Sequence, residues 1–398
     1  MNLMELAASV GITAKLPEKM LAFAETYRDN GAVACDLAVV EALQREHNLF
    51  GQFIDPIMRA GEAINENETL SAWVRVSSQY ALQADFADAR SIPVPPTDGT
   101  ETMDFLPLFM LLPQIPVSIA QYRDRGFPEA ELEDLLRGYQ GGISIVRNQT
   151  GRPGVNQTYF NWFIHYTKAI LFKTHTLQFE KFTMPLGACW LKNKETGEII
   201  PFVLNAVFCD DGKHRLGSAG FEECPETFQV LFEEDEENYY GYPTYDCVVS
   251  SQRETFPKTK WECVARPGDD CLNMHIPKGA DISRENMTKA CKSALEIVAQ
   301  RYPECKGRLI FCASWLLDPT LSELLGENSK ITSFQQSFTR YPTKDGGTAV
   351  FSFAFTRRPA DLRDLPEDTS LQRKIKAHYL NGGYIYGYSG IYTGSECQ

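Results

Sequence analysis

The residues best suited to chemistry stand where two apolar runs end. His275 closes the run 271–276, and Ser314 and Trp315 close the run 308–315. An imidazole exchanges protons near neutral pH, and a serine hydroxyl can donate or accept a hydrogen bond. If both runs are neighbouring parallel strands, a crevice opens at their carboxyl ends. The sequence therefore predicts a site between His275 and Ser314.

Local signals indicate how these residues are positioned. The run 271–276 stops at Pro277, and Ser283 then suits the N-cap of a helix whose apolar face continues to Val298. The run 308–315 is apolar on both faces, as central parallel strands are. We therefore expect a strand–helix–strand unit.

The chain beyond this unit should complete a mixed sheet. Asp318 before a proline is typical of a helix start, and Gly326 is typical of its end. Residues 331–341 and 348–357 predict an antiparallel hairpin, as do the apolar segments on either side of 193–197. A mixed sheet with flanking helices follows.

The first part of the chain shows helical periodicity, and a cluster of breakers at 148–154 interrupts it. We expect a helical N-terminal domain over residues 1–152 and a sheet domain over 153–398, which is an α+β fold class. The later helices are expected near 104–123, 128–147 and 157–176.

Composition narrows the class of partner. The formal net charge of −13 over 398 residues disfavours nucleic acid and anionic membranes, which select clustered Lys and Arg. No apolar stretch approaches the ~20 residues that span a bilayer, and the N-terminus does not resemble a signal peptide. We expect a cytoplasmic protein that acts on a small molecule.

The eleven cysteines are scattered and form no Cys-x-x-Cys pair. No histidine stands at zinc-ligand spacing from two of them. We expect reduced thiols, most of them buried, and no metal.

Several segments together resemble a known family. The longest is Cys312-Ala313-Ser314-Trp315-Leu316-Leu317-Asp318-Pro319, accompanied by His275-Ile276-Pro277, Leu177-Gln178-Phe179-Glu180, Trp162 and His165. These pieces resemble bacterial proteins described as containing an acyltransferase domain, with a helical N-terminal domain and a GNAT-like C-terminal domain. The resemblance covers most of the chain after residue 100.

The resemblance implies a co-substrate, acetyl-CoA or another acyl-CoA, held between two parallel strands. Its pyrophosphate would meet the loop and helix start after the first strand, where we expect Ile276, Lys278, Gly279 and Ala280 to bind it. The usual GNAT loop, Gln or Arg followed by x-x-Gly-x-Gly or Ala, is absent, and Asp281 adds a negative charge. A plain strand-to-helix turn is the alternative.

Acyl transfer to an amine needs a base for the amine proton and an acid for the leaving thiolate. We assign His275 as the base, with Ser314 and Asp318 as further catalytic candidates. A core histidine, a satisfied hydroxyl and a helix cap are the structural alternatives for these three residues.

Four more residues are candidates for substrate binding: Cys312, Trp315, Trp162 and His165. For each of them a role in packing or at a domain interface is the alternative. The function expected is an acyl-CoA-dependent N-acyltransferase that acts on an amine or another small nucleophile. The alternatives are a non-catalytic GNAT-like binding or scaffold protein, and a thiol hydrolase that uses Cys312 with His275.

Overall fold

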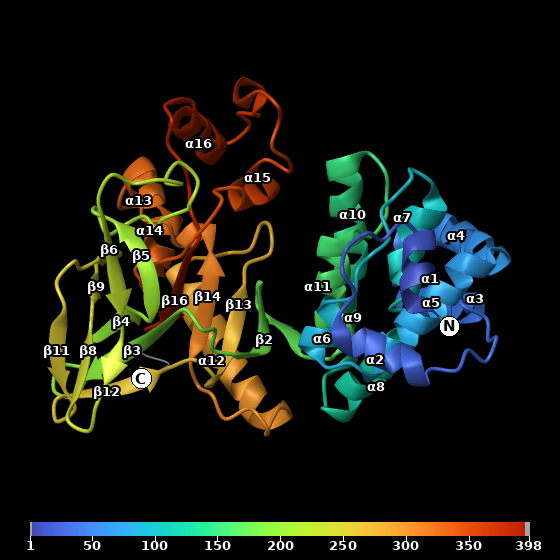
Figure 1. The fold of residues 1–398 in the computed structure, drawn as a ribbon, viewed down its shortest axis with the longest axis horizontal. Coiled ribbons are helices and arrows are strands. Elements are labelled where there is room, and N and C mark those ends of the chain that lie inside the picture. The colour runs from blue at the N-terminus through green and yellow to red at the C-terminus, as the bar shows by residue number, and fades with distance from the viewer. Residues whose placement is uncertain (1, 395–398) are drawn as a thin grey trace. The chain divides into compact units, whose positions relative to one another are not determined.

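The structure is a computed structural model that describes residues 2–394. It divides into two compact units, Met1–Phe172 and Lys173–Gln398. The first is helical, and the second combines a sheet with helices (Figure 1). This organisation confirms the predicted α+β class.

The first unit is built from short helices, several of which begin at side-chain caps. Asp36, Asn67 and Asn156 each accept a hydrogen bond from a backbone N–H in the first turn of the following helix. The elements are α1 (Leu3–Ser9), α2 (Glu18–Thr26), α3 (Leu37–His47), η1 (Gly51–Phe53), α4 (Ile54–Glu66), α5 (Glu68–Gln83), α6 (Phe86–Arg90), α7 (Glu101–Phe109), α8 (Gln114–Asp124), α9 (Glu129–Leu136), α10 (Gly138–Thr150) and α11 (Gln157–Thr167).

The breaker cluster that predicted a domain boundary lies inside the first unit. Gly151 ends α10 in the left-handed conformation, at φ 84°, and the chain turns there into α11. Helix α11 packs against α6, α8 and α10. The compact units divide after Phe172, and the breaker cluster forms a turn between two helices of the first unit.

Three predicted helices are interrupted in the structure. Residues 104–123 form α7 and α8, and residues 128–147 form α9 and α10, which meet at Arg137. The helix predicted over 157–176 stops at Thr167, and residues 171–174 of that segment form a strand. Apolar spacing alone does not separate a short buried strand from a helix end.

Among the described residues, no single helix has the length and apolar content that crossing a bilayer requires. Helices α7 and α8, bent by 41° at their junction, meet that requirement only when taken together.

A six-stranded sheet in the order β1-β2-β13-β14-β16-β15 forms the centre of the second unit. Strands β13 and β14 run parallel, whereas β13 with β2, β14 with β16, and β16 with β15 are antiparallel. The strands are β1 (Leu171–Thr174), β2 (Leu177–Thr183), β13 (Asp270–His275), β14 (Ile310–Ser314), β15 (Phe338–Pro342) and β16 (Tyr388–Tyr392).

The predicted strand–helix–strand unit is confirmed. Helix α12 (Arg284–Arg301) joins β13 to β14, and Ser283 caps it by accepting a hydrogen bond from the backbone N–H of Asn286. The remaining helices of this unit are η2 (Trp315–Leu317), α13 (Thr320–Leu325), α14 (Lys330–Gln335), α15 (Ala349–Ala354), η3 (Leu362–Asp364) and α16 (Ser370–Leu380).

The hairpin predicted over 331–341 and 348–357 is wrong. The first of these segments begins with α14, and the second contains α15, which buries Val350 and Phe351. Strand β15 pairs instead with β16, near the end of the chain. The apolar residues of 348–357 therefore belong to a helix face.

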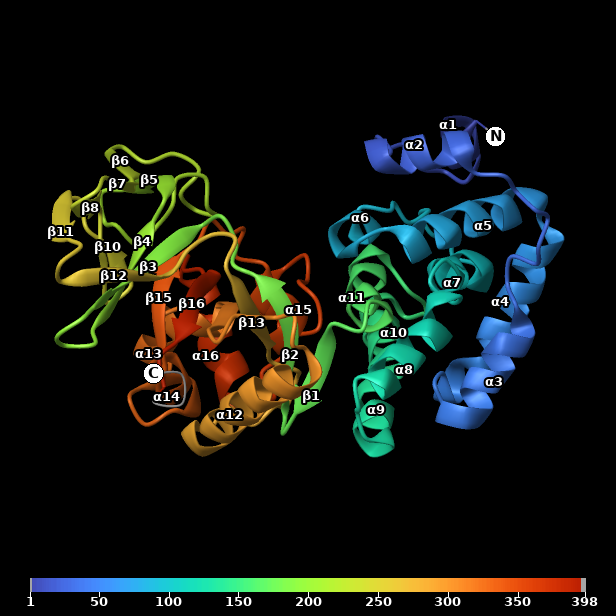
Figure 2. The ribbon, with the colours of Figure 1, turned by 90° about the horizontal axis from the view of Figure 1, so that it is seen from below.

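The segment between β2 and β13 forms small sheets of short strands, and β3 with β4 confirms the hairpin around 193–197. The strands are β3 (Ala188–Asn193), β4 (Ile199–Val203), β5 (Asn205–Cys209), β6 (Thr227–Leu231), β7 (Glu233–Glu234), β8 (Asn238–Gly241), β9 (Thr244–Tyr245), β10 (Val248–Val249), β11 (Glu254–Pro257) and β12 (Trp261–Ala265). In Figure 2 these strands gather on one side of the central sheet and α12 lies on the other.

One pair of cysteines in this insertion is oxidised. Cys209 and Cys224 form a disulfide with their Cα atoms 5.8 Å apart. The expectation of reduced thiols is therefore wrong for this pair, because the fold returns the loop after β5 to the end of that strand. The other described cysteines form no disulfide, and Cys397 lies outside the described residues.

Candidate active site

The parallel strands β13 and β14 separate at their carboxyl ends. Their ladder contains only the pairs Leu272 with Ile310 and Asn273 with Phe311. Beyond this point β13 stays paired with β2 as far as His275, and β14 stays paired with β16 as far as Ser314. Such a splay frees backbone groups of both strands to pair with an extended ligand.

Polar side chains gather on one face of the sheet beside the splay. Asn273 and His275 are two residues apart on β13 and so point to the same side. The register places Glu180 of β2 next to Asn273, and Phe311 and Ala313 of β14 share this side. We call this side of the sheet the site face.

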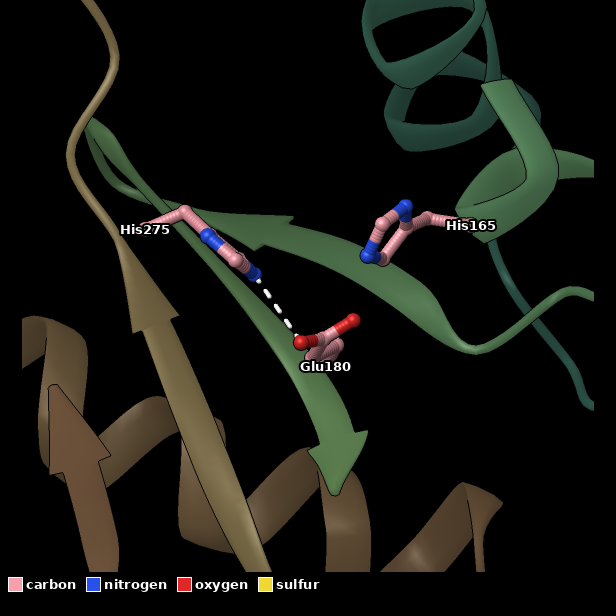
Figure 3. Close-up of side chains that lie close together, drawn as sticks. All are labelled: His165, Glu180 and His275. Carbon is pink, nitrogen blue, oxygen red and sulfur yellow. Dashed lines mark ion pairs between the residues drawn. The ribbon is translucent and has the colours of Figure 1, made fainter. Parts of the chain in front are cut away.

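Oε1 of Glu180 lies 3.2 Å from Nε2 of His275 on the site face, a contact that becomes an ion pair only when the imidazole is protonated (Figure 3). Glu180 is 1% exposed, whereas the His275 side chain is 24% exposed. Nδ2 of Asn273 donates to the same Oε1 at 2.8 Å. A buried carboxylate needs such partners, because an unpaired buried charge is costly. Glu180 therefore orients an accessible imidazole.

The middle of the site face is open at Ala313. This alanine is exposed although β14 is a central strand. Its neighbour on β16 is Ser389, which in turn lies beside Tyr341 on β15. Two residues earlier on β14 the face is covered, because Phe311 belongs to the apolar cluster formed with the small strands. The exposed alanine thus leaves room for a ligand next to His275.

Ser314 does not share the site face with His275. It alternates with Ala313 along β14 and therefore points to the opposite side of the sheet. Its hydroxyl accepts a hydrogen bond from the backbone N–H of Leu316 at 3.1 Å and so caps the turn η2. The predicted crevice is present as a splay, but these two side chains do not converge in it.

Asp318 is buried, at 1% exposure, and both its carboxylate oxygens have backbone partners. Oδ1 accepts from the N–H of Thr320 at 2.8 Å, and Oδ2 accepts from the N–H of Tyr386 at 2.6 Å. Burial raises the pKa of this carboxyl, although these hydrogen bonds oppose the rise. The geometry gives Asp318 the structural role of joining α13 to the segment before β16.

Cys312 and Trp315 are enclosed side chains. Cys312 is buried on the side of β14 opposite the site face, and burial raises the pKa of its thiol to about 12. Trp315 packs in an apolar cluster with Leu321 and Val350. Both positions match the packing alternatives that the sequence leaves open.

We expect iodoacetamide to alkylate Cys263 before Cys312 in the folded protein. The Cys189 thiol and the Arg266 guanidinium hold the pKa of the half-buried Cys263 thiol below its usual value, and the thiolate is the reactive form. Labelling of Cys263 should slow as the pH falls below neutrality. Peptide mass spectrometry after short exposures measures both sites. Rapid labelling of Cys312 would contradict its burial and would support the alternative of a thiol hydrolase that uses Cys312.

The loop predicted to hold pyrophosphate forms a turn before α12. The N–H of Ala280 donates to the carbonyl of Pro277 at 3.0 Å, and Lys278 and Gly279 are exposed. Gly279 has φ +82°, a conformation that favours glycine. The helix begins only at Arg284, so its first turn lies beyond the predicted residues.

A cavity of about 230 Å³ adjoins that first turn of α12. Arg284 and Thr288 line it from the helix, and Gln336 and Ser337 line it from the end of α14. A guanidinium, hydroxyls and a helix N-terminus suit a negatively charged ligand.

Trp162 and His165 lie on α11 in the helical unit. His165 is buried, and its Nδ1 lies 2.9 Å from the carbonyl oxygen of Trp162. The rings of Trp162 and Phe86 flank the imidazole at 4.7 and 4.8 Å between centroids. Within its own unit His165 is thus an aromatic-packed core histidine.

The sequence prediction missed Glu180, Asn273 and Ala313 as site residues. Two signals were available: an acid within the apolar segment 177–183, and an asparagine two residues before His275. An alanine carries no chemical signal, and only the structure shows that it is exposed in a central strand.

Comparisons with known proteins agree with this fold. Residues 171–392 match the GNAT-like C-terminal domain family. The chain shares its fold with an acyltransferase solved with decanoyl-CoA and teicoplanin, at a TM-score of 0.66 and 17% identity, over 98% of this chain and 99% of that one. An acyltransferase mutant solved with octanoyl-CoA matches at 0.65 and 17%, over 99% of each chain. No curated protein sequence matches the chain significantly.

Proposed function

Because the chain belongs to the GNAT-like C-terminal domain family, we propose that it is an acyl-CoA-dependent acyltransferase. Its acceptor is an amine or a similar small nucleophile. The observation that carries this proposal is the splay of β13 and β14 directly beside the Glu180–His275 pair. The similar folds solved with decanoyl-CoA and octanoyl-CoA support it.

The splay provides the place for the acyl-CoA thioester. Its pantetheine arm would pair with the backbone of β13 beyond Asn273, where β14 no longer does. The thioester would then lie over exposed Ala313, next to His275. Acetyl-CoA and longer acyl-CoAs both carry the groups that this arrangement recognises.

The Glu180–His275 pair would remove the acceptor proton. Because buried Glu180 accepts at Oε1, Nε2 of His275 carries its hydrogen toward that oxygen and Nδ1 keeps the lone pair. The amine nitrogen attacks the thioester carbonyl carbon, the C–S bond breaks, and the amine proton passes to Nδ1. Glu180 stabilises the resulting imidazolium, and the proton finally neutralises the departing thiolate.

The phosphates of coenzyme A would bind at the start of α12. Lys278 and the turn at Gly279 precede the helix, and Arg284 extends the positive charge into the neighbouring cavity. The negative charge of Asp281 is partly neutralised within the loop, because its carboxylate accepts hydrogen bonds from the Ser283 backbone and from Lys330.

We expect Arg284→Gln to raise the KM for acyl-CoA by about ten- to hundredfold with little change in kcat. Hydrogen bonds from a charged donor to phosphate contribute about 1.5–3 kcal/mol to binding. Steady-state kinetics with decanoyl-CoA measure both constants. Lys292→Gln is the matched control, since it removes an exposed charge further along the same helix. An unchanged KM for Arg284→Gln would place the phosphates elsewhere.

The proposed function is tested by calorimetric titration of acetyl-, octanoyl- and decanoyl-CoA, followed by thiol release with a panel of amines. We expect at least one acyl-CoA to bind and to release coenzyme A only when an amine is present. Binding without turnover of any amine would identify a non-catalytic binding protein. Absence of binding by all three would reject the proposal.

A further inference from the structure

One arginine near the site face lacks a counter-ion. Arg215 is half-buried in the loop that the Cys209–Cys224 disulfide closes. Within residues 2–394 its guanidinium makes no hydrogen bond and no ion pair. Burial lowers the pKa of this guanidinium, and the Tyr341 hydroxyl is the group that opposes the shift. No carboxylate neutralises it.

The two other arginines of the insertion between β2 and β13 are ion-paired. Arg253 contacts Glu233, and Arg266 contacts Glu234. All four of these side chains are at least one third exposed to solvent. Partial burial of a charge without a partner is unfavourable, so it calls for a specific explanation. A half-buried guanidinium without a counter-ion presents planar hydrogen-bond donors that match a carboxylate or a phosphate.

The surroundings of Arg215 place it on the side of the sheet where the site lies. It forms a backbone bridge with Phe208, and Phe208 packs in the same apolar cluster as Tyr341 and Phe311. Tyr341 is joined through Ser389 to exposed Ala313 by strand pairing across the site face. Arg215 therefore lies near the β15 edge of the site face, whereas His275 lies on β13 at the other side of the same face.

The loop that carries Arg215 is held in place on both sides. The disulfide closes it, and the N–H of Ala219 donates to the carbonyl of Asp345 at 3.0 Å. The Tyr386 hydroxyl donates to the carbonyl of Ala219 at 2.7 Å. A guanidinium on such a loop needs little reorganisation to bind, which favours specific recognition.

We propose that Arg215 binds an anionic group of the acceptor, a carboxylate or a phosphate that is separate from the amine to be acylated. The proposal rests on the proposed function. Three strand spacings separate Tyr341 on β15 from His275 on β13, which at about 4.8 Å each is roughly 14 Å. The acceptor is therefore elongated, with its anion roughly 10 Å or more from its amine.

The experiment compares acceptors that differ only in the anion. The ω-amino acids aminohexanoate, aminooctanoate and aminododecanoate are set against hexylamine, octylamine and dodecylamine, and aminododecyl phosphate tests the second anion. Arg215→Met keeps the apolar stem without the charge, and Arg215→Lys keeps the charge. Arg253→Gln is the matched control, because it removes an exposed guanidinium from the same insertion. Steady-state transfer kinetics and calorimetric binding in the presence of coenzyme A are both measured.

We expect the wild type to prefer the longer anionic acceptors over the alkylamines by about ten- to hundredfold in kcat/KM. Arg215→Met should abolish the preference and leave alkylamines unaffected, whereas Arg215→Lys should keep part of it. Equal preference in wild type and Arg215→Met, or no preference in wild type, would overturn the inference. If no amine is acylated, the proposed function fails, and calorimetry alone decides: binding of an anionic probe that Arg215→Met loses supports the inference, and any other result rejects it.

Discussion

Replacing His275 by Gln is expected to lower kcat by about a hundredfold to ten-thousandfold, the usual contribution of a general base. Glu180→Gln should lower kcat by a smaller factor, because it removes the charge that orients the imidazole and stabilises the imidazolium. The double variant should lose little more than His275→Gln, because the two side chains act as a unit. Thiol-release kinetics at saturating acyl-CoA measure each loss.

Binding and stability separate this catalytic role from a structural one. Neither substitution should weaken acyl-CoA binding in calorimetry, since the pantetheine contacts proposed for β13 use its backbone. Glu180→Gln should not lower the thermal midpoint, because it replaces a buried charge by a neutral group of the same shape. His175→Asn is the control: His175 is an exposed histidine with φ 53°, a conformation that asparagine tolerates. Full activity of His275→Gln would remove His275 from the mechanism.

The sequence predicted the elements whose signals are local. Ser283 as a helix cap and the runs of β13 and β14 are each determined by a few adjacent residues, and they occur where expected. Which strands pair with one another was not predictable from such local signals. Strand β15 pairs with β16 across the α15 and α16 segment, and this pairing depends on tertiary packing and not on a turn signal.

The residues of the candidate site likewise differ in whether local sequence signals identify them. His275 stands at a strand end, so its residue type and position marked it from sequence alone. Its partner Glu180 comes from β2, and the long insertion between β2 and β13 hides their adjacency. Ser314 was assigned to the same crevice because it ends the next strand. Only the register shows that it points to the opposite side of the sheet.

Reduction of the Cys209–Cys224 disulfide is expected to destabilise the second unit. The bond spans 15 residues, and closing a loop of that length contributes about 3 kcal/mol by restricting the unfolded chain. For a unit of this size the thermal midpoint should fall by roughly 6–12 °C. Scanning calorimetry of the wild type with and without dithiothreitol, and of Cys209→Ser with Cys224→Ser, measures the shift. Cys263→Ser, at a free thiol, is the control.

The same reduction tests how Arg215 is held. In the oxidised protein the loop is closed at its base and docked on Asp345 and Tyr386. Without the disulfide only the docking contacts remain, so the guanidinium should be less well ordered and its preference for anionic acceptors should shrink. Activity toward alkylamines should persist, because His275 and Glu180 lie on the central sheet, outside this loop. A thermal midpoint insensitive to dithiothreitol, with both thiols already free in the untreated protein, would show that the bond does not form, and the order of the Arg215 loop would then depend on the docking contacts alone.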